Sequence, residues 1–282
     1  MKVKEIPLSI YQTLKLRAIG LKELLHPGES LPVIVSLTSF EKRLHVADLP
    51  VRSLLSRKHK PVKILLWLHD TLEGRIPKSL SQLEGSLFSI HFSDWDRSHL
   101  KLVRTLEMYP ETLVATIDDD LIYRDGWLEK LYSEHLRKPG HILANQTRLI
   151  RHGRDGSVLP YAQWPTNYNP ALGGNQILPI GSAGALYPPG SLDSRFGDVD
   201  LFQKLAPKAD DLWFKAMSLL KGTPSAQTAD RPGSPVPIFG SQTVSLKKEN
   251  IDQDRNRNQW QALIDYFNLT LDGTQYGRGS TG

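Results

Sequence analysis

The feature that most constrains the fold of this chain is an alternation of short apolar runs with segments of helical spacing. Continuous apolar runs are typical of strands buried on both faces, and such strands separated by helices form mostly parallel sheets. Strands are predicted at 31–39, 61–70, 88–93 and 114–117, and helices at 49–57, 99–109, 126–138 and 209–222. We therefore expect an α/β fold with a mostly parallel sheet flanked by helices, in which ligands bind beyond the carboxyl ends of the strands.

Three consecutive carboxylates, Asp118, Asp119 and Asp120, end the fourth predicted strand, with no neighbouring cation in the sequence to balance them. Adjacent negative charges inside an apolar run are unfavourable unless something neutralises them. Mg²⁺ and Mn²⁺ prefer hard oxygen ligands, often one or two carboxylates together with substrate phosphates. In an extended chain Asp118 and Asp120 point to the same side. We expect these two residues to hold a divalent cation that carries a phosphate, the alternative being an acidic turn or helix cap.

A second acidic pair, Asp210 and Asp211, opens the predicted helix in "ADDLWFK". The start of a helix favours negative charge, so capping explains one of the two carboxylates, and Asp210 is the better candidate for it. Trp213 follows Asp211 by two positions, which places the Asp211 carboxyl against apolar surface. Desolvation raises the pKa of a carboxyl group, so Asp211 is predicted to act as a general base.

The stretch from 151 to 190 is rich in Gly, Pro, Asn and aromatic residues, which is typical of a binding surface on loops. In "YAQWPTNYNP" the rings of Tyr161, Trp164 and Tyr168 suit stacking on sugars, the alternative being an aromatic mini-core. In "GSAGALYPPGSL" small residues let a ligand approach the backbone, and Tyr187 offers a ring. A further loop is predicted within 222–235.

Composition excludes several classes of protein. The chain of 282 residues has no cysteine, which excludes disulfides, thiolate metal sites and cysteine nucleophiles. Its basic residues form no dense patch interleaved with aromatics, so no nucleic-acid partner is expected. No apolar stretch is long enough for a membrane span, and the N-terminus lacks the apolar core of a signal peptide, so a cytoplasmic protein is expected. Residues 1–30 are basic and amphipathic, which favours either contact with an anionic membrane surface or a helix packed on the domain.

Six segments together resemble a known family. They are "VIVSLTSFEKRL", "LPVRSLLSR", "PVKILLWL", "ATIDDDLIY", "GALYPPGSL" and "ADDLWFKAMSLLKG". In this order and at these spacings they resemble bacterial glycosyltransferases with the Rossmann-like GT-A fold, most of all the glycosyltransferase-2-like proteins of capsule and lipopolysaccharide gene clusters. The likeness covers roughly residues 30 to 260, and its specific part is the strand with three aspartates together with the later Asp-Asp-Leu-Trp.

The resemblance implies an inverting, metal-dependent enzyme that moves a sugar from a nucleotide-diphosphate sugar to a hydroxyl of a glycan or lipid-linked glycan. Asp118 and Asp120 match the metal pair of the family, and Asp211 or Asp210 matches its catalytic base. The implied nucleotide-sugar contacts are Thr38, Arg43, His69, Asp70, Lys101 and Asp119, and the implied acceptor contacts are Trp164, Tyr187 and Trp213. The implied organisation is a nucleotide-sugar-binding half at 31–125, an acceptor-binding and catalytic half at 126–270, and a flexible tail at 271–282.

One departure from the family concerns the metal. Many metal-dependent members supply a late histidine as a further ligand, but this chain has no histidine after His152. Asn250 and Asp252 are candidate substitutes. Other functions stay open: a sugar nucleotidyltransferase, which would normally carry a glycine-rich phosphate loop where "SLTSFEKRL" has no glycine, a non-catalytic glycan- or nucleotide-binding protein, or a two-metal nuclease.

Overall fold

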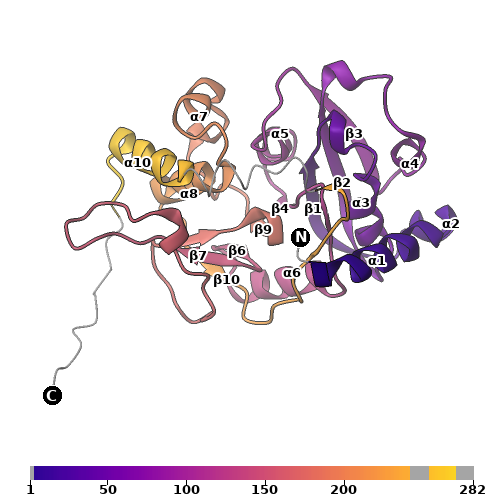
Figure 1. The fold of residues 1–282 in the computed structure, drawn as a ribbon, viewed down its shortest axis with the longest axis horizontal. Helices are drawn as coiled ribbons and strands as arrows, with labels where there is room; N and C mark the ends of the chain where they lie inside the picture. Colours follow the sequence, from indigo (N-terminus) through magenta and orange to yellow (C-terminus); the bar gives the residue numbers. More distant parts are fainter. Residues whose placement is uncertain (1–2, 242–253, 271–282) are drawn as a thin grey trace.

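The computed structural model describes residues 3–241 and 254–270. Within them, one seven-stranded sheet crosses the molecule (Figure 1). Its strands, in spatial order, are β10 (Ser225–Gln227), β6 (Ile142–Ala144), β9 (Ala185–Tyr187), β4 (Leu113–Thr116), β1 (Glu29–Thr38), β2 (His59–His69) and β3 (Phe88–Ser93). Every neighbouring pair is parallel except the two pairs that contain β9, which runs antiparallel to β4 and β6. The predicted α/β fold with a mostly parallel sheet is confirmed.

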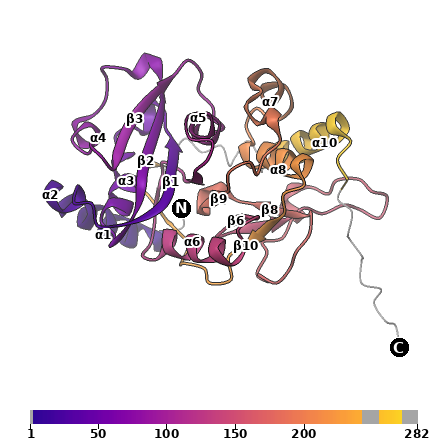
Figure 2. The same ribbon diagram turned by 180° about the vertical axis from the view of Figure 1, so that it is seen from behind.

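Helices cover both faces of this sheet (Figures 1 and 2). The described helices are α1 (Ile6–Ala18), α2 (Leu21–Leu24), α3 (Asp48–Leu55), α4 (Lys78–Ser81), α5 (Leu100–Met108), α6 (Trp127–Arg137), α7 (Val199–Leu205), α8 (Asp210–Lys221) and α10 (Arg255–Phe267). One apolar core lies between the sheet and α3, α4 and α6, and a second lies between the sheet and α5, α7, α8 and α10. Along β4, Ala115 belongs to the first core and Val114 to the second, because successive side chains of a strand point to opposite faces.

Two short antiparallel ribbons complete the strands: β5 (Leu121–Ile122) with β11 (Val236–Pro237), and β7 (Thr147–Leu149) with β8 (Ile177–Pro179). The loop predicted within 222–235 is wrong in part, because β10 lies inside it. The three residues of β10 are buried and pair with β6 at the edge of the sheet. A strand of three residues is too short to show a periodic pattern. Its burial depends on the neighbouring elements and not on its own sequence.

The basic N-terminal segment forms α1, which buries Ser9 and Leu16. Arg17 on this helix reaches across to the chain near α3 and lies 3.6 Å from the buried carboxylate of Asp48. Tyr11 and Leu14 remain largely exposed. No helix in the described part of the chain is long and apolar enough to cross a membrane. The predicted tail at 271–282, together with Asn250 and Asp252, lies outside the described residues.

Candidate functional site

The two acidic groups meet at the carboxyl edge of the sheet. The parallel strands β1, β4, β6 and β10 all end at this edge, where they lead into Ser39, Asp118, Asn145 and Thr228 respectively. Because β9 is antiparallel, the short turn before it, Gly181–Ala183, lies at the same edge. Residues far apart in the sequence are thereby brought to the place where open α/β sheets bind ligands.

The three aspartates form a turn rather than an extended strand, because β4 ends at Thr116. Asp119 is buried and accepts hydrogen bonds from the Ser39 hydroxyl at 2.5 Å and from Arg43 at 2.6 Å. The same guanidinium lies 3.1 Å from the carboxylate of Asp120. The prediction that Asp118 and Asp120 share one side is therefore corrected: Asp119 and Asp120 share Arg43, while Asp118 faces a different cation.

That cation is Lys101 on α5, whose side chain is almost completely buried. Its Nζ donates to the Asp118 carboxylate at 2.8 Å and lies 3.3 Å from the Asp210 carboxylate on α8. Burial acts to lower the pKa of Lys101, but these carboxylates outweigh it and hold the pKa well above the usual value. Lys101 is thus a fixed positive charge that joins the two acidic groups. The sequence around the aspartates showed neither Lys101 nor Arg43 as a neighbour, because these two cations come from other elements of the fold.

The acidic pair on α8 differs in environment. The residue that caps the helix is Ala209, with no side-chain capping bond, so the predicted capping role of Asp210 is wrong. Burial acts to raise the pKa of Asp210, but Lys101 outweighs it and the pKa is lowered. Asp211 accepts a hydrogen bond from the Gly181 amide at 3.0 Å, and burial, reinforced by the Asp210 charge, raises its pKa to about 8. The pair therefore consists of one stable carboxylate and one carboxyl that gains and loses a proton near neutral pH.

The turn Gly181–Ala183 is held on its other side by two aromatic residues. The Tyr123 hydroxyl accepts from the Asp118 amide and donates to the Ser182 carbonyl, both at 2.9 Å. The Trp127 indole donates to the Ala183 carbonyl at 2.8 Å. A Cβ on Gly181 would lie 2.9 Å from the Asp211 carboxylate, and one on Gly184, whose φ is +102°, would clash with the Trp127 ring. The small residues here make room for the protein's own side chains.

The other predicted nucleotide contacts lie along the same edge, away from the aspartates. The Thr38 hydroxyl donates to the Trp67 carbonyl of β2 at 3.0 Å, so it ties two strands together. His69 ends β2 and lies 3.1 Å from the half-exposed carboxylate of Asp70. Arg43 and Lys101 are the predicted contacts that the structure places directly against the aspartate turn.

The predicted acceptor contacts Trp164, Tyr187 and Trp213 are all buried in the second core. Trp164 packs in a cluster with Tyr161, whose ring centre is 5.0 Å away, so this part of the loop-rich stretch forms the aromatic mini-core. The indole of Trp213 donates to the Phe196 carbonyl at 2.8 Å. The structure gives these rings a packing role, and it leaves Tyr168 as the exposed ring of the stretch.

The aspartates fit a divalent cation in chemistry but not as a complete protein site. Asp118 and Asp120 offer hard carboxylate oxygens, the ligands that Mg²⁺ and Mn²⁺ prefer. In the part of the chain that the structure covers, no three His, Asp or Glu side chains are grouped as a metal site. A cation here would take its remaining ligands from a phosphate or water, and would share the two carboxylates with Lys101 and Arg43.

No protein-family model and no curated protein matches the chain. Solved structures with a similar fold include 4-diphosphocytidyl-2C-methyl-D-erythritol synthase from Anaerococcus prevotii, at 14% identity and a TM-score of 0.47, over 87% of this chain and 99% of that one. Another is CMP:2-keto-3-deoxy-manno-octonic acid synthetase complexed with CTP, at 10% identity and a TM-score of 0.41, over 74% of this chain and 92% of that one. At these identities the likeness is one of fold alone.

Proposed function

We propose that this protein is an inverting glycosyltransferase that moves a sugar from a nucleotide-diphosphate sugar to a hydroxyl of a glycan or lipid-linked glycan, in bacterial surface polysaccharide synthesis. The observation that carries the proposal is the arrangement around Lys101. This buried cation joins the aspartate turn after β4 to the carboxyl pair of α8, of which Asp211 titrates near neutral pH. A group suited to take a proton therefore lies beside a group suited to face a diphosphate.

The chemistry is a single displacement. The Asp211 carboxylate takes the proton of the acceptor hydroxyl while that oxygen forms a bond to the anomeric carbon, and the bond from this carbon to the diphosphate oxygen breaks. The leaving diphosphate carries away the electron pair, and Lys101 and Arg43 lie at the edge where its negative charge develops. A divalent cation held by Asp118 and Asp120, when bound, would supply further positive charge to the diphosphate.

Sugar nucleotidyl transfer is the second candidate. The observation that favours it is the presence of two cations at one strand end, Arg43 and Lys101, which suits a nucleoside triphosphate. It is also the kind of reaction named for the two similar structures, although their low TM-scores keep that likeness at the level of the fold. The turn after β1 has no glycine-rich phosphate loop, and this reaction gives a base at Asp211 no clear task.

The released product distinguishes the two candidates. The purified protein is incubated with Mn²⁺ and either a panel of nucleotide sugars plus short glycans, or nucleoside triphosphates plus sugar phosphates. Release of nucleoside diphosphate that falls about 100-fold or more in Asp211→Asn supports glycosyl transfer. Release of pyrophosphate supports nucleotidyl transfer instead. Nucleotide binding without either product would identify a non-catalytic binding protein and refute both.

A further inference from the structure

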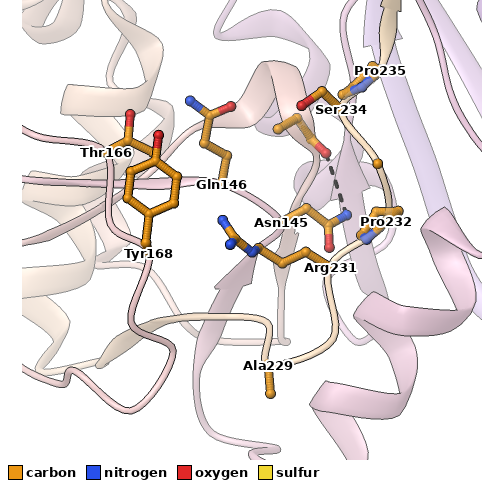
Figure 3. Close-up of a pocket in the computed structure, with 11 residues that line it drawn as sticks. Asn145, Gln146, Thr166, Tyr168, Ala229, Arg231, Pro232, Ser234 and Pro235 are labelled. Atoms are coloured by element: carbon orange, nitrogen blue, oxygen red, sulfur yellow. Dashed lines mark hydrogen bonds between the residues drawn. The ribbon is translucent and has the colours of Figure 1, made fainter.

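A cavity of about 650 Å³ lies beside the turn Gly181–Ala183 and is not used by the chemistry above. Asn145 and Gln146, which follow β6, line it together with Ala183 of the turn before β9. The loop after β10, including Arg231, forms another wall, and Thr166 and Tyr168 from the loop-rich stretch form the opposite one (Figure 3). A cavity of this size is large enough for one or two sugar residues.

The position of this cavity relates it to Asp211. It lies at the carboxyl edge, at the ends of β6 and β10, whereas Arg43 and the aspartate turn lie toward the ends of β1 and β4. The turn Gly181–Ala183 separates the two regions: the Gly181 amide binds Asp211, and Ala183, two residues later, lines the cavity. A ligand in the cavity and the expected nucleotide therefore lie on opposite sides of the turn Gly181–Ala183.

The lining of the cavity carries a net positive charge. It contains one arginine and no aspartate or glutamate. Among the described residues, the Arg231 side chain has no ion-pair partner, and the neighbouring carboxylate of Asp230 lies 3.0 Å from Lys130 instead. Figure 3 shows the Arg231 guanidinium directed across the cavity toward Tyr168 and Gln146. An arginine in this setting is available for a carboxylate or phosphate of a ligand, which it can bind through two parallel hydrogen bonds.

The opposite wall supplies an aromatic platform. The Tyr168 ring is 75% exposed, and the Arg231 guanidinium carbon lies 5.6 Å from its centre. The side chains of Asn145, Gln146 and Thr166 offer donors and acceptors around it. An exposed ring beside uncharged polar groups suits the apolar face and the hydroxyls of a sugar, and the arginine adds a requirement for negative charge.

We propose that this cavity binds an anionic sugar residue, with Arg231 on its carboxylate or phosphate and Tyr168 against its ring. The assignment of this residue to the acceptor rests on the proposed glycosyl transfer, whereas the binding of an anionic sugar does not. The acceptor of the enzyme is accordingly an acidic glycan or a sugar phosphate, whose terminal hydroxyl reaches Asp211 past the turn Gly181–Ala183.

Saturation-transfer NMR on the intact protein tests the binding with glucuronic acid, glucose 1-phosphate and glucose as probes, without any turnover. We expect at least one anionic sugar to bind about tenfold or more tightly than glucose, and Arg231→Gln to remove that preference. Tyr168→Ala should weaken the binding of every sugar that binds to the wild type. Arg154→Gln, which removes an exposed arginine outside the cavity, should change nothing. Binding of glucuronic acid alone identifies a carboxylate as the anion, and binding of glucose 1-phosphate alone identifies a phosphate.

Three results would overturn the proposal. The first is equal binding of glucose and both anionic sugars. The second is an anion preference that survives in Arg231→Gln while that variant keeps the wild-type melting temperature. The third is competition between UDP and the anionic sugar that depends on Arg231, which would make the cavity part of the nucleotide site. Because none of these measurements needs a nucleotide sugar or any turnover, the proposed glycosyl transfer can fail while the anionic-sugar site stands, and the reverse.

Discussion

Replacing Asp211 by Asn should make the protein less active and more stable at the same time. The folded protein holds a proton on Asp211 up to about pH 8, whereas the usual pKa of this group is 3.8. Between these values the unfolded chain releases the proton and the folded chain retains it, so the stability of the wild type falls as the pH rises from about 4 to about 8. A difference of about 4 in pKa, at about 1.4 kcal/mol for each unit, corresponds to an upper bound on the order of 6 kcal/mol.

The Asn side chain removes this penalty and still accepts the hydrogen bond from the Gly181 amide. Its two new N–H donors offset part of the gain, so we expect about 2–3 kcal/mol at pH 8, or a rise of about 5 °C in melting temperature. The gain should shrink toward pH 4, where both states of the wild type are protonated. Turnover should fall about 100-fold or more, because the base is lost.

Calorimetric melting at pH 5 and pH 8, together with turnover from pH 6 to pH 9, measures both effects. Wild-type activity should rise with pH through about 8 as Asp211 ionises. The matched control is Asp210→Asn, which removes the neighbouring negative charge. It should move the rise in activity to lower pH, because that charge contributes to the raised pKa of Asp211. A melting temperature of Asp211→Asn equal to that of the wild type at pH 8, or full turnover in this variant, would refute the reasoning.

Four further outcomes are expected. Asp118→Asn and Asp120→Asn should lose most of the Mn²⁺-dependent binding of nucleoside diphosphate. A wild-type affinity for nucleoside diphosphate that titration calorimetry finds to be equal with Mn²⁺ and with EDTA would contradict this. Arg43→Ala should weaken that binding about tenfold and lower the melting temperature, since Asp119 loses its cationic partner while it keeps the Ser39 hydroxyl. Lys215→Met should raise the melting temperature at pH 7, with a gain that shrinks toward pH 10, because burial lowers the pKa of Lys215 to about 7 and the unfolded chain binds the proton more tightly. Removal of residues 2–25 should abolish co-sedimentation with anionic vesicles, which in the intact chain should fall as salt rises.

Much of the fold was predictable because burial on both faces leaves a pattern in the sequence. The predicted strands and helices lie within two or three residues of the observed ones in the first half of the chain, as at β3 and α5. The sequence did not predict that β9 runs antiparallel to its neighbours, nor that β10 is a strand at all. Their pairing depends on β4 and β6, and segments of three residues are too short to show a period.

The site was predictable in its carboxylates but not in their partners. Strand ends and helix starts place Asp118 and Asp211 at one edge by topology alone. Arg43 and Asp119 are 76 positions apart, and no local pattern shows that they meet. The link that the Tyr123 hydroxyl makes between the aspartate turn and Ser182 was not predictable either, because a tyrosine after an apolar run is typical of an ordinary core residue. In the aromatic stretch, composition suggested stacking rings but did not show that Trp164 is buried and Tyr168 exposed.

The position of β10 has a consequence for engineering. This strand lies at the outer edge of the sheet and pairs with β6 alone, and the loop that follows it forms one wall of the cavity around Arg231. The carboxylates of the proposed reaction centre belong to the turn after β4 and to α8, so they do not share a backbone segment with that loop. A combinatorial library restricted to residues 229–235 can therefore sample new binding preferences while every group assigned to proton and phosphate chemistry stays in place.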